Sequence, residues 1–95
     1  MIPPLRYFDD FTIGEKFETA PATLSESDTI AFAERYDPQP FHLDAGAARE
    51  SVFRDLTASG WQTAAMTMRS VVDTGILRAT GIIGTGIDEL RWFAP

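Results

Sequence analysis

Apolar residues between Gly60 and Leu77 recur with the spacing of a helix. They fall three or four positions apart and form one face, which holds Trp61, Ala64, Ala65, Met68, Val71, Val72 and Gly75. The pattern predicts a helix from Gly60 or Trp61 to about Leu77, roughly 25 Å long. Ser59 is placed to cap its N-terminus. A helix with so little polar surface is usually enclosed by a sheet.

Two other segments alternate in the manner of strands. Residues 16–24 are rich in β-forming residues, although Pro21 restricts them to an edge or a bulge, and residues 87–93 alternate cleanly. Between the first of these and the long helix, Ser25 predicts the N-cap of a helix that ends at Tyr36, because Pro38 disfavours helical geometry at the residue before it. Asp44 is placed to cap a further short helix.

Composition narrows the class of protein. The 95 residues are enough for one small domain, and 44% apolar with 23% charged residues is typical of a globular chain. A net charge of −6 without a basic stripe argues against nucleic-acid binding. With no cysteine and one histidine, neither disulfides nor a closed structural metal site is expected. The sequence also contains no recognisable signal peptide or membrane span, so a cytoplasmic protein without membrane contacts is expected.

The segment from Tyr36 to His42 carries the clearest candidate chemistry. Asp37 and His42, the only histidine, stand five residues apart in a loop that contains two prolines. Acid–base catalysis needs two proton-handling groups at a fixed separation, and histidine exchanges protons near neutral pH. Taken alone, the same residues also fit an ordinary turn, with a capping aspartate and a half-exposed histidine.

A second candidate lies where the long helix begins, at Ser59, Gly60 and Trp61. A free backbone N–H at a helix N-terminus can donate to a developing oxyanion, and a glycine there lets a carbonyl group approach closely. The alternative is a serine cap followed by a glycine that helps the helix pack.

Taken together, these features resemble the MaoC-like dehydratase family, which includes the (R)-specific enoyl-CoA hydratases. The family motif Gly-Asp-x-Asn-Pro-x-His appears here as residues 36–42, with Tyr36 in place of Gly and Gln39 in place of Asn. The stretches 59–61 and 86–92 also look like that family, and the resemblance runs through nearly the whole chain from Tyr7 onward.

The resemblance implies an α+β hotdog fold, in which an antiparallel β-sheet wraps a long central helix. Residues 1–95 would form a single domain that stops after the first strand following this helix and lacks the C-terminal strands of a full domain. Such a chain would leave the apolar helix face uncovered, so a homodimer or higher homo-oligomer is expected.

The implied reaction is the reversible hydration of a trans-2-enoyl-CoA to a 3-hydroxyacyl-CoA. The resemblance assigns Asp37, His42 and Gly60 to catalysis, and Gln39, Ser59 and Trp61 to substrate binding. No separate cofactor is implied, because CoA is part of the acyl-CoA substrate. Two alternatives stay open: a hotdog acyl-CoA thioesterase, which would need a carboxylate on the long helix, and a non-catalytic domain for acyl-thioester binding or assembly.

Overall fold

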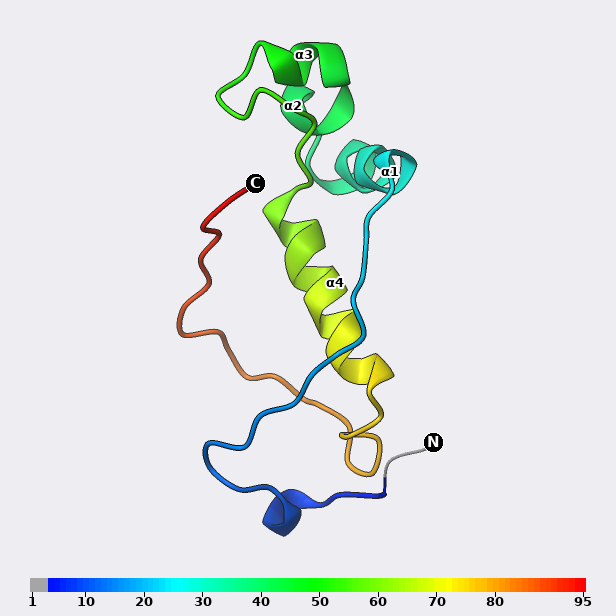
Figure 1. Ribbon diagram of the computed structural model, residues 1–95, viewed down its shortest axis with the longest axis vertical. Coiled ribbons are helices and arrows are strands. Elements are labelled where there is room, and N and C mark those ends of the chain that lie inside the picture. Colours follow the sequence, from blue (N-terminus) through cyan, green and yellow to red (C-terminus); the bar gives the residue numbers. More distant parts are fainter. Residues whose placement is uncertain (1–3) are drawn as a thin grey trace. The chain divides into compact units, whose positions relative to one another are not determined.

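The structure, a computed structural model, describes residues 4–95 and divides them into two compact units. One unit comprises residues 4–22 and 66–90, and the other comprises residues 23–65 and 91–95. The elements in chain order are a 3-10 turn η1 (Phe8–Asp10) and the helices α1 (Glu26–Tyr36), α2 (Pro40–Leu43), α3 (Ala45–Arg49) and α4 (Gly60–Asp73) (Figure 1).

Helices α1 and α3 begin where the sequence places their caps. The Ser25 hydroxyl accepts the Asp28 N–H at 3.1 Å, and α1 ends at Tyr36, as expected from Pro38. The Asp44 carboxylate accepts the Ala47 N–H at 2.8 Å and so caps α3. These side chains satisfy amide groups that no helical carbonyl can reach. Helix α2 packs against both α1 and α3.

Helix α4 begins at Gly60, as predicted, but it ends at Asp73 and not near Leu77. The Thr74 hydroxyl donates to the Val71 carbonyl at 2.6 Å, and Gly75 has a φ of 73°. A left-handed glycine directly after the last turn ends a helix, because the chain can no longer continue its right-handed winding. The apolar spacing beyond this point therefore overstated the length of the helix.

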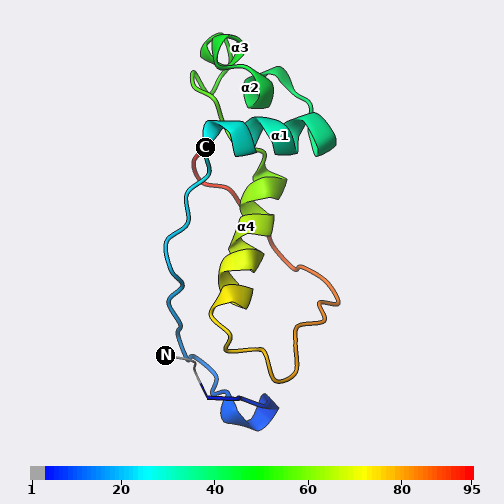
Figure 2. The same cartoon turned by 90° about the vertical axis from the view of Figure 1, so that its right-hand side faces the viewer.

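The predicted α+β hotdog fold is wrong for the described residues. Residues 4–95 contain helices but no β-strand, so no antiparallel sheet wraps α4. The segments expected as strands, 16–24 and 87–93, run without helix or strand in both views (Figures 1 and 2). Alternation predicts which side chains could share a face, but a strand also needs a neighbour about 4.7–4.9 Å away to pair its amides and carbonyls. Within residues 4–95 neither segment forms a ladder of hydrogen bonds with another segment.

The apolar face of α4 is accordingly exposed. The exposed fractions of Trp61, Met68 and Val72 are 62%, 51% and 55%, whereas Gln62 is the buried residue of this helix. The prediction that a sheet encloses α4 is therefore wrong for the described residues. No helix within residues 4–95 is long and apolar enough to cross a bilayer.

Candidate functional site

The ends of two helices place the acid–base pair. Asp37 follows the last turn of α1, where its backbone N–H donates to the Ala33 carbonyl at 2.9 Å. Pro40 then opens α2, because its fixed φ suits a first helical position that needs no amide hydrogen. His42 lies in the next turn and is buried. The short α1–α2 connection thus holds the two side chains near each other.

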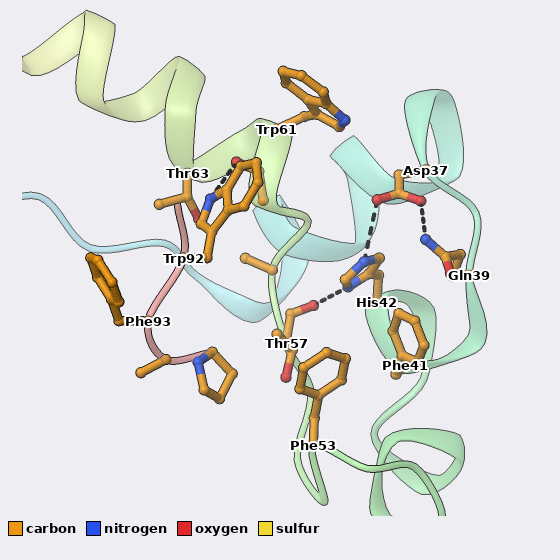
Figure 3. A pocket seen from close by; sticks show the side chains of 14 residues that line it. Asp37, Gln39, Phe41, His42, Phe53, Thr57, Trp61, Thr63, Trp92 and Phe93 are labelled. Carbon is orange, nitrogen blue, oxygen red and sulfur yellow. Dashed lines mark hydrogen bonds and ion pairs between the residues drawn. The ribbon is translucent and has the colours of Figure 1, made fainter. Parts of the chain in front are cut away.

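The Asp37 carboxylate meets a polar group at both of its oxygens. Gln39 Nε2 donates to Oδ1 at 2.6 Å, and Ser59 Oγ donates to Oδ2 at 2.7 Å. His42 Nε2 lies 3.3 Å from Oδ2 (Figure 3). The hydrogen bonds from Gln39 and then Ser59, with the charge of His42, outweigh partial desolvation and hold the pKa of Asp37 below its usual value of 3.8. Asp37 is therefore a carboxylate at neutral pH.

The contact of His42 Nδ1 determines which ring nitrogen carries the hydrogen. Nδ1 faces the backbone carbonyl of Thr57, which can only accept a hydrogen bond, so Nδ1 carries a hydrogen. In the neutral ring Nε2 then carries only a lone pair, so its 3.3 Å approach to Asp37 Oδ2 becomes an ion pair when Nε2 takes up a proton (Figure 3). With 8% of the His42 side chain and 19% of the Asp37 side chain exposed, the pair is only partly open to solvent. Nε2 is thus the atom that can take and return a proton.

Gln39 should tune the acidity of Asp37. Replacement by leucine removes the donor at Oδ1 and should raise the Asp37 pKa toward 3.8, as followed by carbon-13 NMR of the carboxyl group. A lowered native pKa stabilises the fold above the unfolded value, and this stability is lost as pH falls through the native pKa. The acid-unfolding midpoint should therefore move to higher pH in Gln39→Leu. An unchanged Asp37 titration would contradict the role of this hydrogen bond.

A cavity of about 630 Å³ opens beside the pair, within one compact unit. Asp37, Gln39 and His42 line it together with Gly60 and Trp61 from the start of α4. The remaining wall is mostly apolar and includes four aromatic residues: Phe41, Phe53, Trp92 and Phe93 (Figure 3). A few polar side chains grouped in a largely apolar cavity are the usual arrangement of a small-molecule site.

The structure brings the sequence-predicted residues together, with one correction. Ser59 does precede α4, and its carbonyl accepts the Gln62 N–H at 3.0 Å. Its hydroxyl, however, donates to Asp37 and does not cap the helix. Within residues 4–95, the Gly60 N–H meets no acceptor, as is usual for the first amide of a helix.

Sequence reasoning does not predict four residues that help to build the site: Phe41, Phe53, Thr57 and Trp92. Thr57 contributes its backbone carbonyl, and a backbone acceptor cannot be recognised from the residue type. Phe41 stacks edge-to-face on His42, with ring centroids 4.6 Å apart, and Phe53 meets Phe41 at 5.1 Å. The position of Phe41 directly before the histidine was the available signal for the first contact. The sequence predicts a strand position and a family-like stretch for Trp92 but no place at the site, whereas it lines the cavity.

No group of three or more possible metal ligands occurs in the described part of the chain. The site contains a carboxylate, an imidazole of fixed orientation, and a free helix N-terminal amide around an apolar-walled cavity. These features are typical of sites at which side chains exchange protons with a small molecule.

Comparison with known proteins identifies the family. Residues 10–95 match the MaoC-like domain. The chain also resembles the crystal structure of the MaoC-like dehydratase from Rhodospirillum rubrum, with 48% identity, a TM-score of 0.87, and coverage of 94% of this chain and 60% of that one. A Bacillus subtilis (strain 168) protein, YdeM, described as uncharacterized, is 33% identical over 87 residues, which are 92% of this chain and 62% of YdeM. The chain therefore belongs to the MaoC-like domain family, and it spans about 60% of the length of these relatives.

Proposed function

We propose that this chain carries the acid–base site of a hydro-lyase, which hydrates a trans-2-enoyl-CoA to a 3-hydroxyacyl-CoA and catalyses the reverse dehydration. The observation that carries the proposal is the Asp37–His42 pair, held by side-chain donors on Asp37 and by the Thr57 carbonyl on His42. Membership of the MaoC-like domain family and the likeness to a MaoC-like dehydratase support a hydratase or dehydratase.

In the proposed reaction His42 moves the proton. Its bare Nε2 takes a hydrogen from water, and the resulting hydroxide adds to the β-carbon of the enoyl thioester. The negative charge of the Asp37 carboxylate, whose Oδ2 lies 3.3 Å from Nε2, stabilises the imidazolium that forms. The same Nε2–H then protonates the α-carbon, so that the two hydrogens and the oxygen of one water add across the double bond. A positioned acid–base group of this kind contributes about 10²–10⁴ in rate.

The start of α4 would stabilise the negative charge that develops on the thioester oxygen. The Gly60 N–H has no acceptor among residues 4–95, and the helix dipole places partial positive charge there. A single such donor is worth about 10²–10³ in rate. Gln39 and Ser59 hold Asp37, and Trp61 contributes apolar wall to the acyl-CoA site. No cofactor beyond the CoA of the substrate is needed in this scheme.

The proposal is tested by incubating the chain with crotonyl-CoA and following the loss of the enoyl absorbance, with free thiol measured in parallel. Loss of absorbance without thiol release is the expected result. Thiol release in place of hydration would favour a thioesterase, and neither change in a folded sample would favour a non-catalytic acyl-thioester-binding or assembly domain.

The structure offers the thioesterase alternative little support. The acidic residue of α4 is Asp73, which is exposed, pairs with Arg69 at 2.8 Å and does not line the cavity beside His42. The expected homodimer or higher oligomer stays a prediction, and the exposed apolar face of α4 supports it.

A further inference from the structure

Trp92 lies unusually close to the backbone at the start of α4. A Cβ atom placed on Gly60 would come within 2.7 Å of Trp92 Cε2 and 3.0 Å of Trp92 Nε1. The indole N–H also donates to the Gly60 carbonyl at 3.2 Å (Figure 3). The rings of Trp92 and Trp61 meet edge-to-face, with centroids 6.1 Å apart. An alanine at position 60 would therefore displace the Trp92 indole from its present position.

The turn formed by Ser59 and Gly60 is held at two points. Ser59 Oγ donates to Asp37 Oδ2 at 2.7 Å, and Ser59 itself is fully buried. On the other side, the Gly60 carbonyl accepts the Trp92 indole N–H. A movement of this turn would displace both the donor on Asp37 and the free Gly60 amide. The indole thus acts on two functional groups without touching the acid–base pair.

We propose that Trp92 is a positioning residue of the site: its indole clamps the first turn of α4, and thereby fixes the Ser59 hydroxyl against Asp37 and the Gly60 amide beside the cavity. The catalytic consequence rests on the proposed hydro-lyase function. The clamp itself rests on the contacts of Trp92 alone and can be tested without substrate.

The first test is a double-mutant cycle read as melting temperature. Gly60→Ala should lower the melting temperature by at least about 4 °C, because the new methyl group overlaps the indole. In a Trp92→Ala background the same Gly60→Ala change should cost nothing, since the space is empty and alanine favours the helix over glycine. In a Trp92→Phe background the indole atoms that overlap the methyl group, Cε2, Cζ2 and Nε1, are missing or displaced, so the cost should be smaller than with Trp92. Additive effects throughout the cycle would overturn the clamp, because residues that share a contact should not add.

The second test is spectroscopic and remains usable if a Trp92 variant folds poorly. The chain has two tryptophans, so nitrogen-15 spectra contain two indole N–H signals, and Trp61→Phe identifies the one that belongs to Trp92. That signal should exchange slowly with solvent and should shift in Gly60→Ala. A Trp92 signal that exchanges freely, or that ignores Gly60→Ala, would contradict the hydrogen bond and the clamp.

Enzyme kinetics then show whether Trp92 positions the catalytic groups or only stabilises the fold. Trp92→Phe keeps a ring but loses the indole N–H, and a lost hydrogen bond of this kind corresponds to about a 3–10-fold change. We expect that fall in kcat with crotonyl-CoA, with little change in KM. A change confined to KM in an active protein would overturn the positioning role. If the wild-type chain hydrates no thioester, the proposed function fails, and the melting cycle and the indole signal still decide the clamp.

Discussion

Asp37→Asn should lower kcat for enoyl-CoA hydration by at least about 100-fold, the lower end of what a positioned acid–base group contributes. The amide is close in shape to the carboxylate but carries no charge to stabilise the His42 imidazolium, whose Nε2 lies 3.3 Å from Oδ2. Its NH₂ group would also face one of the two donors, Gln39 Nε2 or Ser59 Oγ. Steady-state rates with crotonyl-CoA measure the effect.

Glu34→Gln is the matched control for this change. It removes the same charge from an exposed position on α1 that does not line the cavity, and it should leave the rate unchanged. Circular dichroism of both variants shows whether the helices are retained. An Asp37→Asn protein that is folded and as fast as the wild type would contradict the catalytic assignment.

Two substitutions at His42 should separate its catalytic role from its structural one. His42→Ala removes both ring nitrogens and leaves the Thr57 carbonyl without its donor. It should therefore lose activity and also stability, by about 0.5–1.5 kcal/mol for the lost hydrogen bond. In His42→Asn the shorter side chain can place its amide N–H near the position of Nδ1, but nothing replaces Nε2. That variant should keep more of the stability while kcat falls by about 10²–10⁴.

Thermal unfolding and crotonyl-CoA kinetics on the two His42 variants provide the comparison. Equal loss of stability with full activity in His42→Asn would show that the imidazole serves only to pack against Phe41 and Thr57. Loss of activity in both variants, with greater stability in His42→Asn, is the expected pattern.

The site was more predictable from the sequence than the fold was. Asp37 and His42 are joined by a short, proline-containing connection, so their proximity is a local property of residues 36–42. Ser59 was correctly placed at the start of α4, but its hydroxyl was assigned to the helix cap when it in fact binds Asp37, 22 residues earlier in the chain. The spacing of residues does not show whether the Ser59 hydroxyl binds the helix backbone or the distant Asp37.

The prediction of two strands was wrong for a different reason. The alternation in residues 16–24 and 87–93 describes each segment alone, whereas a sheet is a property of pairs of segments. The described residues provide no pairing for either segment. Trp92 is a second example of a long-range contact that a local pattern does not predict. Its position in an alternating segment does not indicate the contact with Gly60, because that contact depends on how distant segments pack.

The most direct test of the central claim is mass spectrometry of the product formed from crotonyl-CoA in oxygen-18 water. If Asp37 and His42 activate water for addition at the β-carbon, the chain should yield 3-hydroxybutyryl-CoA that carries one oxygen-18 on its new hydroxyl group, with the thioester intact. Label found in a released carboxylic acid, with free CoA, would contradict the account and indicate thioester hydrolysis. Unlabelled, unchanged crotonyl-CoA from a folded sample would show that the pair does not perform hydration in this chain.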